Sequence, residues 1–167
     1  MAENSHTVVA AGQFTVTLSH PLWENGAETT INGFKLEGQM VQDQQLMDSS
    51  KVVALANGNT ITITNNNKAG TLTFNVTSTG NDGDMIKIAK FLKRSNDSVG
   101  GTIQVTQDIN GVTHRDIYYA CTVKSCPNRI IQGNDAPDYQ VVWNYGEYNP
   151  EEEGENATKN ETAPTGE

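Results

Sequence analysis

The segment Thr71-Leu72-Thr73-Phe74-Asn75-Val76-Thr77 alternates large apolar residues with small, uncharged polar ones. Because successive side chains of a β-strand point to opposite faces, this period of two predicts a strand with one apolar and one polar face. The same alternation recurs in Phe14–Leu18, Thr60–Thr64 and Thr102–Thr106. The sequence therefore predicts a mainly antiparallel β protein whose strands are covered on one side.

About seven strands are expected, arranged as an antiparallel sandwich or a partly closed barrel with one short helix. The expected strands are Val8–Leu18, Phe34–Val41, Thr60–Thr64, Thr71–Thr77, Thr102–Gln107, Val112–Val123 and Tyr139–Tyr145. Asn57-Gly58 predicts a turn before Thr60, and a further turn at Asn65–Gly70 would pair Thr60–Thr64 with Thr71–Thr77. Asp108-Ile109-Asn110-Gly111 is the strongest hairpin signal in the chain.

One helix is expected over Met85–Asn96. Asp82 and Asp84 occupy cap and first-turn positions, where a carboxylate stabilises the helix N-terminus. Four apolar residues follow at helical spacing, and three basic residues lie on the opposite side. The apolar stripe is Met85, Ile88, Ala89 and Leu92, and the basic face is Lys87, Lys90 and Arg94. The basic face could bind phosphate, but a solvated face or one that meets an acidic neighbour is the simpler interpretation.

The 167 residues suffice for one domain with a hydrophobic core. Residues 146–167 hold seven acidic side chains against Lys159 alone, and so account for −6 of the formal net charge of −9. That segment has no large aliphatic residue to offset the entropy of ordering. We therefore expect a β domain over residues 1–148 and an acidic, solvated tail over 149–167, with ordering against a partner as the alternative.

Several classes of protein have no support in the sequence. No apolar run approaches the roughly 20 residues of a membrane helix, and the polar N-terminus does not look like a secretory signal, so a cytoplasmic protein without a membrane anchor is expected. Cys121 and Cys126 are expected to be reduced thiols, although a tight turn between them could join them.

No catalytic, cofactor or metal motif stands out, so no enzyme and no cofactor is expected. Asn81–Asp84 resembles the start of a calcium loop but lacks the later ligands, and a helix cap explains it better. His114, Arg115 and Asp116 could be imagined as an acid–base group, but they follow a hairpin turn and have no nucleophile nearby. No glycine-rich phosphate loop or metalloprotease motif occurs.

The polar sides of two predicted strands carry hydroxyl and amide groups without charge: Thr60, Thr62, Thr64, Thr71, Thr73, Asn75 and Thr77. One interpretation is the solvated outer face of a sandwich. The other is the wall of a wet channel that lets a polyanion pass without the phosphate contacts that make binding tight. Subunits that join their sheets edge to edge into a ring would also remove exposed strand edges.

Four segments carry characteristic strand and turn patterns: Gly38–Asp43, Lys68–Val76, Asp108–Asp116 and Gln140–Gly146. In their order, over roughly residues 8–148, these elements resemble the tail tube proteins of contractile-tailed bacteriophages. In that family a strand follows a long loop, a helix comes next, and a strand pair and a final strand complete the domain.

The resemblance implies a hexameric ring that stacks into the inner tail tube of a virion, made in the host cytoplasm. Expected partners are other copies of the chain, a sheath, a tape-measure protein and baseplate or terminator proteins, with DNA passing through without specific binding. The long loop, here about Gln42–Leu55, would reach the neighbouring ring. Its candidate contact residues are Gln42, Gln45, Leu46, Met47, Ser50 and Val53; alternatively, Leu46 and Met47 fold back onto their own core.

Three other functions remain open at this point. The inner tube of a bacterial contractile injection system would have the same architecture but would carry no DNA. A carbohydrate-binding β-sandwich would use aromatic rings as stacking platforms, and the candidates are Trp23, Trp143, Tyr118, Tyr119 and Tyr145. A capsid-decoration or head-completion protein would self-associate without forming a tube.

Overall fold

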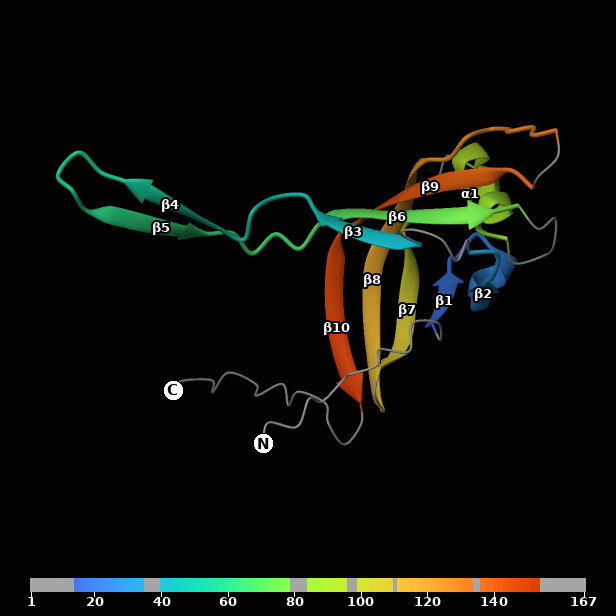
Figure 1. Ribbon diagram of the computed structural model, residues 1–167, viewed down its shortest axis with the longest axis horizontal. Helices are drawn as coiled ribbons and strands as arrows, with labels where there is room; N and C mark the ends of the chain where they lie inside the picture. Colours follow the sequence, from blue (N-terminus) through green and yellow to red (C-terminus); the bar gives the residue numbers. More distant parts are fainter. Residues whose placement is uncertain are drawn as a thin grey trace, which may run out of the picture.

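The computed structural model describes residues 14–34, 40–78, 84–95, 99–109, 111–133 and 136–153. Their fold is mainly β with one α-helix, as the sequence predicted. Most strands form one folded antiparallel sheet, and a narrow two-stranded arm extends from it (Figure 1). The arm lies at one end of the long axis, and helix α1 (Met85–Arg94) lies at the other.

The described residues form ten strands and a short 3₁₀ turn, η1 (Glu24–Gly26). The strands are β1 (Phe14–Ser19), β2 (Thr29–Ile31), β3 (Val41–Gln45), β4 (Ser50–Ala54), β5 (Thr60–Thr64), β6 (Gly70–Thr77), β7 (Gly101–Ile109), β8 (Val112–Ser125), β9 (Asp138–Tyr145) and β10 (Glu147–Glu153). The large sheet has the order β2-β1-β7-β8-β9-β6-β3, with β10 also paired to β8, and β4 pairs with β5 alone. Residues 8–13 and 35–39, parts of two predicted strands, lie outside the described residues.

Strand β8 carries the bend that folds the sheet into a sandwich. Its residues 113–119 pair with β10 and residues 122–125 with β9. Ala120 lies between the two halves with a φ of 55°, which is rare for a residue with a side chain. A Cβ on Gly100 would lie 2.6 Å from the Ala120 Cα, so the close approach of these two backbone segments at this corner requires glycine.

The core lies between the two halves of the folded sheet, and α1 closes one end against β8 and β9. Asp84 caps the helix by accepting the Ile86 N–H at 3.0 Å, which confirms the predicted cap. The predicted apolar stripe of the helix is buried, as are the alternating apolar residues of β6 and β9. The fully buried large side chains include Leu18, Leu72, Phe74, Met85, Ile88, Ile103, Val141 and Trp143.

Two pairings differ from the prediction. Thr60–Thr64 does not pair with β6: β5 pairs with β4, while β6 lies between β3 and β9. The chain thus reverses at Asn57-Gly58 and not at residues 65–70. The local alternation is the same for either partner, so only the long-range pairing distinguishes them.

Strand β10 is the second difference, because the sequence placed residues 149–153 in a solvated tail. Their partners on β8 explain the order. The ring of Tyr148 stacks on Tyr118 with centroids 5.1 Å apart, and Arg115 pairs with Glu151 and Glu153. The described sheet therefore continues to Glu153, past the predicted boundary at residue 148.

Candidate functional site

An arm made of residues 46–69 extends beyond the sandwich (Figure 1). It continues the β3–β6 ladder, because the Leu46 N–H donates to the Ala69 carbonyl at 3.0 Å. Strands β4 and β5 then pair as far as Asn57-Gly58, where Gly58 adopts a φ of 86° that favours glycine. The arm is thus the distal part of one long hairpin whose proximal part belongs to the sandwich.

Polar side chains brace the root of the arm. The Asn65 and Asn67 side-chain oxygens accept the N–H groups of Asn67 and Ala69, each at 2.9 Å. The Asn65 amide also lies 3.2 Å from the Met47 sulfur. Leu46 and Met47 are 64% and 52% exposed, so they do not fold back onto their own core.

The arm has two dissimilar faces. Register pairs Val53 with Ile61 and Lys51 with Ile63, which puts these side chains on one face. Leu55 shares their parity, and we call Val53, Leu55, Ile61 and Ile63 the arm apolar face. Ile61 and Ile63 are 49% and 55% exposed. The opposite face carries Ser50, Val52, Ala54, Thr60, Thr62 and Thr64.

A polar face without charge covers the outer side of β3, β6 and β9. Cross-strand rows align Gln44, Thr71 and Asn144, and likewise Gln42, Thr73 and Val142. The whole uncharged face is Gln42, Gln44, Thr71, Thr73, Asn75, Thr77, Gln140, Val142 and Asn144. A carboxylate appears only at its end, where the Thr77 hydroxyl donates to Asp138 at 2.8 Å.

The predicted site residues thus fall into separate groups. Thr71, Thr73, Asn75 and Thr77 lie together on β6, whereas Thr60, Thr62 and Thr64 lie on the arm. Gln42 and Gln45 belong to β3 in the sandwich, whereas Leu46, Met47, Ser50 and Val53 belong to the arm. Sequence reasoning missed Gln44, Gln140 and Asn144, although the alternation of β9 placed the latter two opposite its buried residues.

A carboxylate in the middle of β3, Asp43, ties the strand that leads into the arm to the core. Asp43 accepts hydrogen bonds from the hydroxyls of Tyr118, at 3.2 Å, and Tyr145. Burial, and then the hydrogen bond to Asp43, raises the pKa of Tyr145; burial and the nearby Asp43 charge do the same to the pKa of Tyr118. Gly70 leaves room for this contact, because a Cβ there would overlap the Tyr145 hydroxyl. The hairpin therefore leaves the sandwich in a fixed direction.

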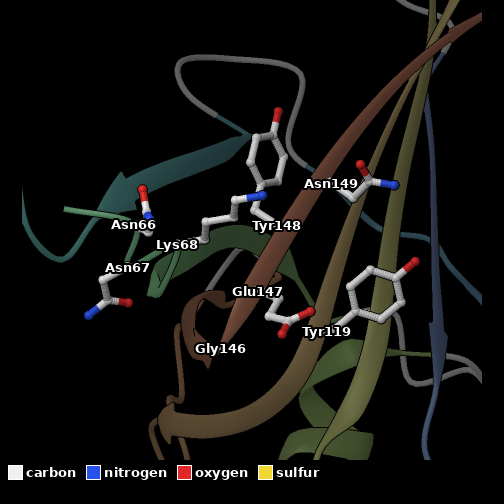
Figure 2. Close-up of a pocket in the computed structure, with 8 residues that line it drawn as sticks. All are labelled: Asn66, Asn67, Lys68, Tyr119, Gly146, Glu147, Tyr148 and Asn149. Atoms are coloured by element: carbon white, nitrogen blue, oxygen red, sulfur yellow. The ribbon is translucent and has the colours of Figure 1, made fainter. Parts of the chain in front are cut away.

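A cleft of about 640 Å³ lies beside the arm root, between residues 66–68 and the start of β10 (Figure 2). Asn66, Asn67, Lys68 and Asn149 contribute polar groups. Among the residues that line the cleft, Tyr119 has an exposed aromatic ring, at 38% exposure.

The other candidate platforms for sugar rings do not form an exposed surface. Trp143, Tyr118 and Tyr145 are at most 5% exposed, and buried rings cannot stack on a sugar. Trp23 is half-buried and packs edge-on against Phe91 with centroids 5.4 Å apart. The candidate rings therefore form no common exposed platform, and the carbohydrate-binding hypothesis loses the aromatic group on which it rested.

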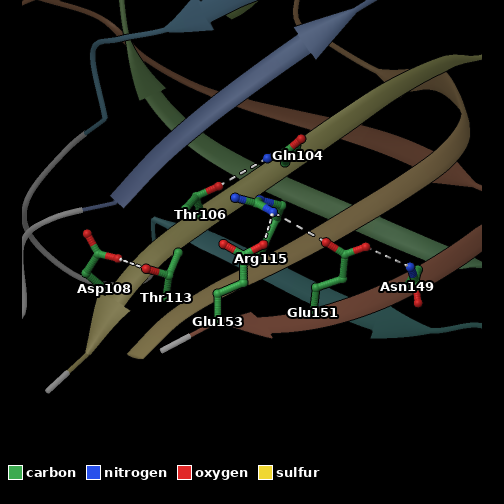
Figure 3. A network of polar contacts seen from close by, with 8 residues as sticks. All are labelled: Gln104, Thr106, Asp108, Thr113, Arg115, Asn149, Glu151 and Glu153. Carbon is green, nitrogen blue, oxygen red and sulfur yellow. Dashed lines mark hydrogen bonds and ion pairs between the residues drawn. The ribbon is translucent and has the colours of Figure 1, made fainter. Parts of the chain in front are cut away.

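The outer face of β7, β8 and β10 is charged, in contrast to that of β3, β6 and β9. Arg115 contacts Glu151 at 3.4 Å and Glu153 at 3.2 Å (Figure 3). Asp108 accepts the Thr113 hydroxyl at 2.7 Å further along the same face. The two outer surfaces of one sandwich thus differ in charge.

Solved structures with the same fold come from contractile injection systems. The cap that terminates the tube of the anti-feeding prophage matches with a TM-score of 0.51 and 11% identity, over 90% of this chain and 99% of the cap chain. A chain of the sheath/tube terminator of the PVC extracellular contractile injection system, in the extended state, matches with 0.58 and 8%, over 88% and 99%. A chain of the extended PVC sheath–tube complex matches with 0.55 and 9%, over 88% and 93%.

This chain has the fold of tube and terminator proteins of contractile systems. No known protein-family model and no curated protein matches it in sequence. The likeness is to structural parts of contractile systems in general and does not single out bacteriophage tails. With identities of 8–11%, it rests on the arrangement of the strands.

The basic residues of α1 are partly engaged by other groups of the same chain. The Lys90 ammonium lies 5.4 Å from the centre of the Tyr139 ring, and Lys93 donates to the Cys126 carbonyl at 3.2 Å. Lys87 and Arg94 are exposed. Of the four basic residues of the helix, Lys90 and Lys93 thus contact other parts of the same chain.

The described residues contain no cluster of three or more potential metal-ligating side chains, and no helix among them has the length and apolar character to cross a membrane. Cys121 and Cys126 are both free and buried, and burial raises the pKa of the Cys121 thiol to about 12. Such a thiol stays protonated at neutral pH and is a poor nucleophile.

Proposed function

We propose that this protein is a structural subunit of the inner tube of a contractile tail or injection machine, in which six copies form a ring and the rings stack. The proposal rests on one observation: a molecule with the fold of tube and terminator proteins has both an uncharged polar face and a protruding arm. The apolar side of this arm is left exposed by its own sandwich.

The uncharged face of β3, β6 and β9 is the proposed wall of the lumen. Its Gln, Asn and Thr side chains hold water but offer a polyanion no cation. Since DNA affinity grows with the number of Lys and Arg contacts to phosphate, such a wall lets DNA slide without holding it. In an injection system the same wall would suit a protein cargo.

The open edges of the large sheet are the proposed ring contacts. Strands β2 and β3 lie at the two ends of the strand order, and β3 has neither proline nor lysine to block pairing. Edge-to-edge pairing around a ring would join the sheets into one barrel and cover the edges of β2 and β3.

The arm is the proposed contact between rings, and Leu46, Met47 and Val53 are its candidate contact residues. A two-stranded hairpin is marginal in water by itself, so the arm gains stability when its apolar face is covered. In this proposal a sheath surrounds the tube, a tape-measure protein fills it during assembly, and a baseplate starts it. In a phage, the protein would reside in the virion tail.

A tube terminator is the second candidate, because two of the matched structures are a cap and a terminator. A terminator would form one ring and stop, whereas a tube subunit would add ring upon ring.

Light scattering over rising protein concentration distinguishes these functions. A tube subunit gives a mass that keeps growing, a terminator gives a plateau near six subunits, and a monomer at every concentration, with or without a preassembled tube end as initiator, would contradict both.

A further inference from the structure

Helix α1 and the loop after β1 lie at the end of the molecule opposite to the arm (Figure 1). They and the segment that follows α1 carry a second set of exposed apolar side chains. We call Leu22, Trp23, Phe91 and Val99 the helix-end patch. Leu22, Phe91 and Val99 are 45%, 42% and 49% exposed, and the half-buried Trp23 contacts Phe91 edge-on. Exposed large apolar side chains that gather at one place indicate an interaction site.

A buried histidine holds the parts of this patch together. His20 accepts the Leu22 N–H at its Nδ1, at 3.0 Å, and its Nε2 lies 2.8 Å from the Val99 carbonyl. This pattern puts the proton on Nε2, since Nδ1 acts as an acceptor. The imidazole is fully buried and links segments 79 residues apart, so the patch is presented on a fixed frame.

We propose that the helix-end patch is the docking site for the arm apolar face of a second copy of this chain. This inference rests on the proposed function, since it takes the arm to be an assembly element. Each surface presents three exposed apolar side chains and one half-buried one, Val53 on the arm and Trp23 on the patch, and the two surfaces lie at opposite ends of the long axis.

The flanking charges are complementary. The arm apolar face carries the cation Lys51, and the exposed Asp48 precedes β4. The patch has the exposed Glu24 next to Trp23, and the exposed Lys87 and Arg94 lie one helical turn before and three residues after Phe91. Each surface thus has both acidic and basic groups around an apolar centre, which favours one orientation of docking.

A contact between two different surfaces of identical subunits is heterologous, so it repeats without limit unless it closes on itself. Copies joined in this way would point in one direction along the tube. The geometry therefore gives the tube a polarity, with free arms at one end and free helix-end patches at the other.

Complementary charge variants test this docking directly. Leu22→Glu disables the patch and Ile63→Glu disables the arm, each on an exposed side chain that should leave the fold intact. Each variant alone should raise the concentration needed for assembly by at least about tenfold, because a charge would be buried in the contact. In an equimolar mixture of the two variants, the intact arm of Leu22→Glu can dock only on the intact patch of Ile63→Glu. The mixture should therefore form pairs of assembly units that grow no further.

Ile131→Glu is the matched control, because Ile131 is an apolar residue at 82% exposure outside both surfaces; it should assemble like the wild type. Circular dichroism of each variant excludes unfolding, and Val99→Glu repeats the patch test at a second position. If Leu22→Glu and Val99→Glu assemble normally while Ile63→Glu does not, the arm docks elsewhere and this inference is wrong, although the tube function stands. If the wild type itself never assembles, with or without an initiator, the proposed function fails together with it.

Discussion

Strands β5 and β6 follow each other in the chain and have the same alternation of apolar and small polar residues, but they lie in different surroundings. In β6 the apolar side chains Leu72, Phe74 and Val76 are at most 1% exposed, because they lie in the core between the two halves of the folded sheet. In β5 the side chains Ile61 and Ile63 are about half exposed, since the arm packs against no other described layer. The difference teaches that the sandwich covers its own apolar side chains, whereas the arm leaves its apolar side chains uncovered, as the proposed contact with another chain requires.

A matched pair of isoleucines gives the largest expected difference between the two regions. Ile103→Ala removes a fully buried side chain and should lower the free energy of unfolding by about 2–5 kcal/mol. Ile63→Ala on the arm should change it by less than about 0.5 kcal/mol. Chemical denaturation at a concentration where the protein is unassembled measures both, and equal losses would show that the arm is part of the cooperative core.

The junction between the two regions comes next. In Gly70→Ala, the added methyl group would overlap the Tyr145 hydroxyl and lie 2.6 Å from the Tyr145 Cζ. Loss of the Tyr145–Asp43 hydrogen bond and local overpacking should cost about 1–3 kcal/mol. Gly133→Ala is the control, because a Cβ there meets nothing within 4 Å. Thermal melts that move equally for both variants would contradict the role of Gly70.

The tyrosines beside the arm root predict an alkaline limit to stability. Burial, and then hydrogen bonds to carboxylates, raises the pKa of Tyr145 and of Tyr148 above the ordinary value of 10. Because the folded state favours the protonated phenols, this contribution is complete below about pH 10 and falls as the pH rises beyond it. Melting temperatures measured from pH 7 to 11 should decline above pH 10, and less steeply in Tyr145→Phe; an identical decline in both proteins would exclude this tyrosine as a cause.

The charged face of β7, β8 and β10 should contribute least. Arg115→Met removes two partly exposed ion pairs, to Glu151 and Glu153, and should cost less than about 1 kcal/mol. The wild-type advantage should shrink in 1 M salt, where the screening length is about 3 Å. An advantage that persists in salt would assign the role of Arg115 to packing of its stem.

The fold class, the helix and its cap, and the buried face of β9 were predictable because each follows from residues close in sequence. The partner of β5 was not, since TITIT at residues 60–64 would alternate in the same way against β4 or β6. Strand β10 was missed because its glutamates and Pro150 look like a tail until Arg115, His114 and Tyr118 of β8 are placed beside them.

The candidate site shows the same division. Single strands revealed the polar residues of β6, but the uncharged face emerges only when Gln44 of β3 and Asn144 of β9 are placed beside Thr71. The helix-end patch joins residues from segments far apart in the chain, so no local pattern could have shown it.

Electron microscopy of the wild type beside the double variant Leu46→Asp/Met47→Asp tests the central claim most directly. Both residues are exposed at the arm root, so the variant should keep the wild-type circular dichroism and melting temperature. The account predicts hollow stacked rings for the wild type and folded subunits or single rings for the variant, because a charge would be buried where rings meet. Long tubes formed equally by both proteins would contradict it.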